Sequence, residues 1–372
     1  MSGRVEVSSI ASLKRRDMHS LSLYIDNLYN EPKLRHLFWE ATLQCNLSCR
    51  HCGSNCNSST PENELTGEDM RSFLDSFAKD FSPREVMLCI TGGEPLLRQD
   101  LFDVMSYAAD LGFLWGLTTN GLLLTDENID KMVQTNCKTV SVSLDGLKDS
   151  HNALRGKDCF DQTVEGIKRL VAAKDFTNVQ VTTVLHKRNI HELLEIYSYV
   201  ESLGVDSWRL TNVEPIGRAN QMENDFLTTD DFLALFDFTR SCRQNHTKPE
   251  VSFGCSHYAT IEYEMDIRDH FFICGAGILV ASIMQNGDIY ACLDIDRKYG
   301  LVQGNIKKDS FKEIWQKGFL PFRQRRDRKN QGCATCEDAP FCRGDSSHTW
   351  DYDADSPKCC LKQLFESKQV DP

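Results

Sequence analysis

The sequence predicts an α/β fold over residues 37–217, followed by a small α+β region that is rich in cysteine. Two observations lead to this prediction. Between residue 37 and about residue 213, short runs rich in β-branched and aromatic residues alternate with amphipathic stretches, which is typical of strand–helix units in a parallel sheet. Beyond residue 250 the chain changes to short strands, few long helices and many cysteines.

Six strands are expected, with helices between them. The strands are predicted at residues 37–42, 85–91, 114–118, 139–144, 179–185 and 208–213. The helices are predicted at residues 66–79, 101–111, 126–134, 162–172 and 190–203. Thr66 is a suitable N-cap for the first helix, and Gly204 a suitable left-handed cap after the last. A closed eight-unit barrel needs about 250 residues, so this stretch is too short to close.

The remaining segments are assigned by their composition. Residues 218–250 are expected to form a helical connector, mainly a helix over 229–245, and residues 251–372 a second domain. Residues 1–36 are expected to form a short amphipathic helical extension with five packing positions, Leu21, Leu23, Tyr24, Ile25 and Leu28.

The composition is ordinary for a soluble globular protein, with 41% hydrophobic residues, 26% charged residues and a net charge of −12. The negative charge argues against nucleic acid or an anionic membrane surface as a partner. The basic run at residues 323–329 is an exception that a solvated helix face explains. Neither a signal peptide nor an apolar span of ~18 residues is visible, so we expect a cytoplasmic protein. Its 16 cysteines are then expected to bind metal rather than form disulfides.

The most informative motif is a set of three cysteines, Cys45, Cys49 and Cys52, directly after the first predicted strand. Structural zinc sites close their shell with four ligands, whereas a site that performs chemistry keeps one position open. A [4Fe–4S] cluster is usually held by four thiolates, so three cysteines leave one iron free for another ligand. The alternative is that the nearby Cys56 closes the site.

The spacing Cys45-x-x-x-Cys49-x-x-Cys52, with the ring of His51 before the last cysteine, resembles the signature of the radical S-adenosylmethionine (SAM) superfamily. The resemblance implies a partial (β/α)6 TIM barrel that is open, and a [4Fe–4S] cluster whose free iron chelates the amino and carboxylate groups of SAM. It also implies reductive cleavage of SAM to a 5′-deoxyadenosyl radical, which abstracts hydrogen from a substrate. An external electron donor of the flavodoxin or ferredoxin type is part of the same implication.

Companion motifs follow in the family's order. Gly92-Gly93-Glu94-Pro95, after the second strand, resembles the motif that holds the SAM amino group, and its glycines allow a tight turn close to a ligand. By the same resemblance, Ser143 is a ribose or SAM contact and Arg155 a partner for the SAM carboxylate. The alternative for both is a plain strand end with an exposed arginine. Asp145 is as well placed to cap the turn as to contact SAM.

The C-terminal cysteines resemble the SPASM domain, which carries auxiliary iron–sulfur clusters. The resemblance assigns Cys255, Cys274 and Cys292 to a first cluster, and Cys333, Cys336 and Cys342, with Cys359 or Cys360, to a second. Ser346 replaces a family cysteine, so the first cluster is open at one site, smaller, or completed by Ser346, Asp345 or substrate. A zinc ribbon is the alternative for the second set. Asn286-Gly287 predicts a β-hairpin with a type I′ turn that brings Cys274 and Cys292 together.

The leading functional hypothesis is a radical SAM/SPASM enzyme that modifies a peptide or protein substrate by crosslinking, epimerisation or oxidation. Asp294 is the candidate general base, because the end of the hairpin should face the barrel mouth. An anaerobic sulfatase-maturing enzyme is a second hypothesis, although Leu293 follows Cys292 where that subgroup has an aspartate. A non-catalytic iron–sulfur or zinc protein is a third. With about 36 residues before the barrel, we expect any leader peptide to be bound by a separate protein or by the barrel edge.

Overall fold

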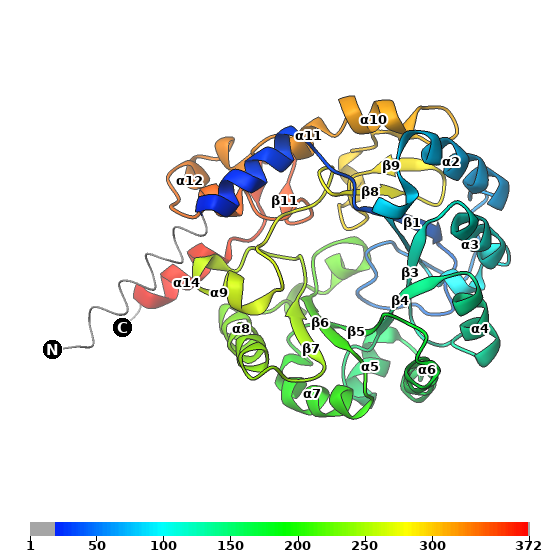
Figure 1. Ribbon diagram of the computed structural model, residues 1–372. Coiled ribbons are helices and arrows are strands. Elements are labelled where there is room, and N and C mark those ends of the chain that lie inside the picture. Colours follow the sequence, from blue (N-terminus) through cyan, green and yellow to red (C-terminus); the bar gives the residue numbers. More distant parts are fainter. Residues whose placement is uncertain (1–18, 371–372) are drawn as a thin grey trace.

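A ten-stranded sheet organises the computed structural model, which describes residues 19–370. Its strand order is β10-β9-β8-β1-β2-β3-β4-β5-β6-β7, and β8 through β1 to β7 all pair in parallel. Strands β1–β7 curve into a partial barrel with helices outside it (Figure 1). No helix within residues 19–370 is both long and apolar enough to cross a bilayer.

Six barrel strands agree with the predicted ones to within a few residues, and a seventh, β7, was not predicted. They are β1 (His36–Thr42), β2 (Met87–Gly92), β3 (Leu114–Thr119), β4 (Cys137–Ser143), β5 (Asn178–Leu185), β6 (Ser207–Asn212) and β7 (Glu250–Phe253). The helices are α2 (Gly67–Asp80), α3 (Leu101–Asp110), α4 (Asp126–Gln134), α5 (Lys148–Arg155), α6 (Phe160–Ala173), α7 (Leu193–Ser202) and α8 (Thr229–Gln244). Thr66 caps α2 as expected, in a capping box with Asp69. The helix expected at 190–203 begins as a 3-10 turn, Ile190–Glu192.

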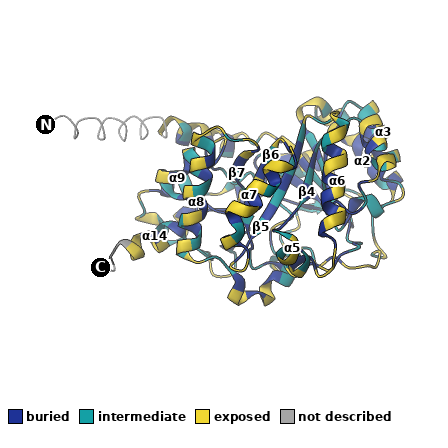
Figure 2. Cartoon of the chain, turned by 90° about the horizontal axis from the view of Figure 1, so that it is seen from below, coloured by how far each residue is buried: buried dark blue, intermediate teal, exposed yellow. Residues whose placement is uncertain are grey.

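The two faces of the barrel sheet differ sharply in chemistry. Trp39, Trp115 and Trp208 are fully buried on the outer face, where the large hydrophobic core lies between sheet and helices. The strands appear buried and the outer helix surfaces exposed in Figure 2. The inner face alternates with it and keeps partial solvent access. Register places mostly small polar side chains there, including Thr91, Thr118, Ser141, Ser143, Gln180, Thr182, Ser207, Arg209, Thr211 and Ser252.

The region after residue 250 joins the barrel sheet at both ends. Strand β7 pairs with β6, and β8 (Val280–Ile283) pairs with β1, so residues far apart in sequence lie side by side. The predicted hairpin forms between β8 and β9 (Asp288–Tyr290). Its turn is not type I′: Gly287 has φ of +90° but Asn286 does not have a positive φ, and Gly287 N donates to Met284 O. The turn therefore spans 284–287 with a glycine in the left-handed region at its end.

The rest of the C-terminal region consists of short elements before and after the hairpin. They are α9 (Thr260–Ile267), β10 (Gly304–Asn305), α10 (Phe311–Lys317), α11 (Leu320–Arg323), α12 (Gln331–Ala334), α13 (Ala339–Cys342), β11 (Trp350–Asp351), β12 (Ser356–Pro357) and α14 (Leu361–Val370). The basic run at 323–329 is not a solvated helix face: it ends α11 and forms a 3-10 turn, and Arg326 is 2% exposed.

The N-terminal extension is helical over residues 19–30 and packs on this C-terminal region, beside α11 and α12 in Figure 1. Residues 1–18 lie outside the described part. Ile25 and Leu28 are buried as expected, but Leu23 and Tyr24 are 58% and 60% exposed, which corrects their assignment as packing positions. Arg343 anchors this helix by donating to Asp26 Oδ1 (2.7 Å) and to the Ser22 carbonyl (2.8 Å).

Replacing Arg343 by methionine is expected to loosen the docking of residues 19–30. The Arg343 side chain is 3% exposed and its charge is compensated by Asp26, so we expect a loss of about 2 kcal/mol in unfolding free energy. Chemical denaturation measures it, with Arg71→Met on the surface of α2 as the matched control. Equal stability of the two variants would show that Arg343 does not hold the helix.

Candidate active site

Two glycines at the end of β2 pack directly against the loop that carries Cys45. A Cβ on Gly92 would collide with the Thr42 carbonyl oxygen, and one on Gly93 with that of Gln44. Gly92 also has φ of +134°, which favours glycine. Gly93 N donates to Thr42 O (2.7 Å) and Glu94 N to Gln44 O (2.9 Å). The glycines are therefore required for β2 to approach the cysteine loop.

The three cysteines of that loop lie together at the carboxyl end of β1. Cys45 and Cys49 are buried and Cys52 is partly accessible. Burial raises the pKa of Cys45 to about 11, and the charges of Glu94, Cys49 and Cys52 add to this rise, so the three sulfurs are electrostatic neighbours. Arg218 holds the loop by donating to the carbonyls of Cys49 (2.7 Å) and Cys56 (2.8 Å).

Cys56 lies against Cys52. A hydrogen bond between the two thiols lowers the pKa of Cys52 to about 5 and raises the pKa of Cys56. Cys56 is 2% exposed and packs with Leu47 and Leu122, as a small buried hydrophobe would.

Glu94 fixes the end of β3 with its carboxylate. It is fully buried and accepts hydrogen bonds from Thr119 Oγ1 (2.9 Å), Asn120 N (2.9 Å) and Leu96 N (3.2 Å). Burial raises the pKa of Glu94 to about 6. Because the Glu94 carboxylate already accepts these hydrogen bonds, we expect the Gly92–Pro95 turn to contact a ligand through its backbone groups. Asn120 Nδ2 in turn lies 3.9 Å from Cys45 Sγ.

Asp145 is the centre of a buried polar network at the end of β4. Its carboxylate pairs with Arg155 (2.6 Å) and accepts from Val184 N (3.0 Å). Arg155 Nη1 also donates to Cys49 Sγ (3.6 Å). Arg155 is thus neither an exposed arginine nor free: Asp145 holds it beside a cysteine of the loop. Asp145 forms this ion pair instead of simply capping the turn.

His51 and Ser143 complete the surroundings of the loop. His51 Nε2 lies 3.7 Å from Asp145, and burial lowers the pKa of His51 to about 4, so the ring is neutral. Ser143 ends β4 on the inner face, in register with Thr182. His51 lies in the loop after β1, whereas Ser143 is the last residue of β4. Their contacts with SAM stay predictions.

Cys255, Cys274 and Cys292 gather at a second place, beside the barrel mouth. Burial raises the pKa of Cys292, and the charges of Asp294, Cys255 and Cys274 add to the rise. Asp294 is exposed, with Oδ2 3.8 Å from Cys292 Sγ.

Serines complete the surroundings of this second group. Ser346 donates to the Cys255 carbonyl (2.5 Å), whereas Ser347 Oγ lies 3.1 Å from Cys274 Sγ. Asp345 is bound to His257 (2.9 Å) and Tyr258 N (2.7 Å). The serine hydroxyl next to a cysteine sulfur is therefore that of Ser347, which sequence reasoning missed.

The five cysteines expected for the second auxiliary cluster line a cavity of about 590 Å³ in the C-terminal region. Its walls include Cys333, Cys336, Cys342, Cys359 and Cys360. Cys360 interacts electrostatically with Cys333, Cys336 and Cys342. At Cys359, burial raises the pKa of the thiol, and the largest effect of a neighbouring charge is that of His257, which lowers it. Within residues 19–370, no group of three His, Cys, Asp or Glu side chains is arranged tightly enough to hold a single metal ion.

One further interaction near the cysteine loop was missed by sequence reasoning. Glu40 on β1 is fully buried, accepts from Ser54 Oγ (2.8 Å) and pairs with Arg297. Arg297 follows β9, so the pair ties the hairpin region to the cysteine loop. Glu40 was visible in the sequence as a carboxylate inside an apolar strand, but its partner lies 257 residues away.

Comparisons with known proteins agree with this geometry. The radical SAM superfamily profile matches residues 39–200, and the SPASM iron–sulfur cluster-binding domain matches residues 274–337. A Methanosarcina barkeri protein named AdoMet-dependent heme synthase is 30% identical over 355 residues, covering 90% of this chain and 97% of the relative. The chain belongs to the radical SAM superfamily.

A second relative and two solved structures extend this result. Mycofactocin maturase MftC of Mycobacterium tuberculosis (strain H37Rv) is 30% identical, covering 83% of this chain and 77% of the relative. Streptococcus suis SuiB bound to S-adenosylmethionine has a TM-score of 0.69 at 18% identity, covering 89% of this chain and 77% of that one. The anSMEcpe structure with bound AdoMet has a TM-score of 0.70 at 19% identity, covering 90% and 95%. These structures share the fold of this chain, and the SPASM domain rests on the match at residues 274–337.

Family membership establishes the cofactors. A radical SAM domain binds SAM and a [4Fe–4S] cluster, and a SPASM domain binds iron–sulfur, which sets aside the zinc alternative. The residues present fit these groups. The three neighbouring thiols of Cys45, Cys49 and Cys52 suit the cluster that binds SAM, and the cysteine-lined cavity of the C-terminal region suits an auxiliary cluster.

Single replacement of Cys45, Cys49 or Cys52 by alanine is expected to abolish SAM cleavage, because each removes one of three thiolates. Cys56→Ala is the matched control, since Cys56 only donates to Cys52, and it should retain cluster iron and SAM cleavage. Iron analysis and chromatography of 5′-deoxyadenosine measure both quantities. Loss of cluster iron in Cys56→Ala, with the fold intact, would make Cys56 the fourth ligand.

Proposed function

We propose that this radical SAM/SPASM enzyme abstracts hydrogen from a peptide or protein substrate held inside the barrel. When bound, the cluster and SAM supply the 5′-deoxyadenosyl radical that removes the hydrogen atom. The chain's own residues position this chemistry: the Gly92–Pro95 backbone, His51, Ser143 and Arg155 would hold SAM at the ends of β1–β4. The polar inner face of the opposite strands would hold the substrate.

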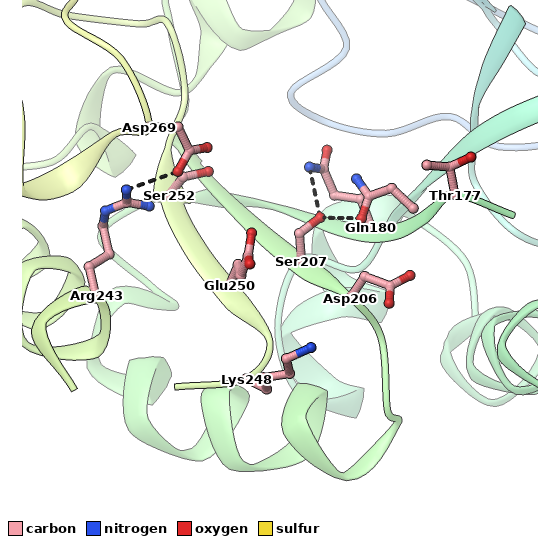
Figure 3. Close-up of a pocket in the computed structure, with 10 residues that line it drawn as sticks. Thr177, Gln180, Asp206, Ser207, Arg243, Lys248, Glu250, Ser252 and Asp269 are labelled. Atoms are coloured by element: carbon pink, nitrogen blue, oxygen red, sulfur yellow. Dashed lines mark hydrogen bonds and ion pairs between the residues drawn. The ribbon is translucent and has the colours of Figure 1, made fainter. Parts of the chain in front are cut away.

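The observation that carries the proposal is the polarity of the barrel interior. At the amino ends of β5–β7, a cavity of about 380 Å³ is lined by hydroxyl, amide and charged side chains, among them Gln180, Ser207, Glu250 and Arg243 (Figure 3). Such walls offer hydrogen bonds to peptide groups, which are costly to bury unpaired.

A tetrapyrrole substrate is the second candidate. The heme synthase relative is covered over 97% of its length, against 77% for the mycofactocin maturase relative. The wider coverage supports a shared domain arrangement with the heme synthases. Their name comes to this chain only as a hypothesis.

Further roles belong to the same proposal. Asp294 would act as general base, because it is exposed beside Cys292 at the barrel mouth. A sulfatase-maturing activity has less support, since Leu293 stands directly after Cys292. An external electron donor would reduce the clusters, and a separate protein would present any leader peptide.

Anaerobic incubation with SAM, a reductant and peptides encoded beside the gene tests the substrate class, with an iron porphyrin as the competing arm. We expect peptide-dependent formation of 5′-deoxyadenosine. Mass spectrometry should show a loss of two hydrogens for crosslinking or oxidation, or solvent deuterium uptake for epimerisation. Product from the porphyrin and none from any peptide would replace the leading proposal by the second.

The auxiliary ligands can be assigned in the same framework. Cys255, Cys274 and Cys292 would hold a first cluster, beside Ser347. Cys333, Cys336, Cys342 and Cys360 would hold a second, because the Cys360 thiol neighbours the other three.

The adjacent pair offers a matched test of the second ligand set. Cys360→Ser is expected to lower bound iron by about one cluster per chain, since a hydroxyl is a poor substitute for a thiolate. Cys359→Ser should keep the full iron content because its thiol neighbours His257 instead. Iron loss confined to Cys359→Ser would reverse the assignment.

A further inference from the structure

Arg209 is an unpaired guanidinium on the inner face of the barrel. It lies in the middle of β6, where Trp208 and Leu210 are fully buried on the outer face and Arg209 points the other way. Its register partners are Thr182 on β5 and Ser252 on β7, which are neutral. Over residues 19–370, no carboxylate forms an ion pair with Arg209, and its side chain remains exposed.

The Arg209 guanidinium extends into the interior rather than to the outer surface. Its positive charge opposes the rise in pKa that burial causes at the thiols of Cys89 and Cys255. Cys89 lies on β2, which is separated from β6 by β3, β4 and β5 in the sheet. Cys89 alternates with the buried Leu88 and Ile90 of β2, so it lies on the inner face of the sheet, as Arg209 does.

The inner face also carries Glu250 on β7, two residues before Ser252, and Glu40 on β1. Glu40 pairs with Arg297, and Ser54 also donates to Glu40. Arg155, at the SAM end, is neutralised by Asp145. Arg209 belongs to the opposite wall, between β5 and β7, away from the strand ends that carry the cysteine loop. An unpaired guanidinium among hydroxyl groups is suited to bind a carboxylate through two parallel hydrogen bonds.

We propose that Arg209 binds a carboxylate of the substrate and thereby determines which substrates enter the barrel. This proposal rests on the proposed function and narrows it to peptides that present a carboxylate in the interior. The carboxylate can be the peptide's C-terminus or an aspartate or glutamate side chain. In either case Arg209 is a specificity-determining residue that orients the substrate toward the SAM end, and it takes no part in proton or hydrogen transfer.

The test uses the reconstituted holoenzyme and a peptide that it converts. Arg209→Gln is expected to raise KM roughly ten- to a hundredfold, as expected for losing a charge-assisted hydrogen bond. Arg209→Lys should recover part of this loss. SAM affinity and substrate-independent 5′-deoxyadenosine formation should stay as in the wild type. Arg71→Gln, on the surface of α2, is the matched control and should leave KM unchanged.

A cycle of paired changes identifies the partner. Peptides with a C-terminal amide, or with aspartate or glutamate replaced by asparagine or glutamine, are compared with the parent peptide. The neutralised peptide that loses affinity for the wild type but not for Arg209→Gln carries the partner carboxylate. Additive losses for every peptide would overturn the proposal. A changed SAM affinity, or a changed auxiliary-cluster EPR spectrum with unchanged KM, would assign Arg209 to SAM or to the cluster instead.

A measurement without turnover separates this proposal from the proposed function. Phenylglyoxal labelling of Arg209 in the holoenzyme, located by mass spectrometry, should be slowed by glutarate and not by glutaramide. Protection by glutarate alone, with no peptide converted, would support the carboxylate site while the peptide proposal fails. Equal labelling rates with both compounds would overturn the carboxylate site whatever the substrate proves to be.

Discussion

The site depends on the close backbone contact between the end of β2 and the loop after β1. Gly92 and Gly93 leave no room for a side chain against the Thr42 and Gln44 carbonyls, and two backbone hydrogen bonds close the gap. This contact sets the position of Cys45 relative to the Gly92–Pro95 turn. Glu94 then fixes the end of β3, because its carboxylate accepts hydrogen bonds from Thr119 Oγ1 and Asn120 N. One pair of glycines therefore aligns three successive strand ends.

The barrel separates stability from chemistry by using opposite faces of one sheet. Outward side chains such as Trp39, Trp115 and Trp208 carry the hydrophobic core, while inward ones are small and polar. A closed TIM barrel fills its interior with branched apolar residues. Here the hydrophobic contribution comes from the helix layer outside. Two walls of the interior differ in charge: on one, Glu40 pairs with Arg297, and on the other, Arg209 is exposed.

Much of this organisation could be predicted from the sequence, because strand alternation, Thr66 capping and the cysteine spacings are local signals. Helix α5 was missed, since its polar sequence has no side-chain N-cap, although Gly156 was available as a left-handed C-cap. Long-range pairings could not be derived: β8 joins β1, Glu40 finds Arg297, and Arg155 finds Asp145. The sequence alone left both Cys359 and Cys360 open as the late ligand, because adjacent residues differ by only one position in their spacing to the other cysteines.

The proposed chemistry requires that Cys45, Cys49 and Cys52 leave one iron of the cluster at the SAM site free to bind SAM. Electron–nuclear double resonance on the reduced holoenzyme, with SAM labelled by ¹⁵N at its amino group, tests it most directly. The account predicts a ¹⁵N coupling to the cluster that disappears when Cys45 is replaced by alanine. A reduced cluster that shows no coupling at saturating SAM would contradict it.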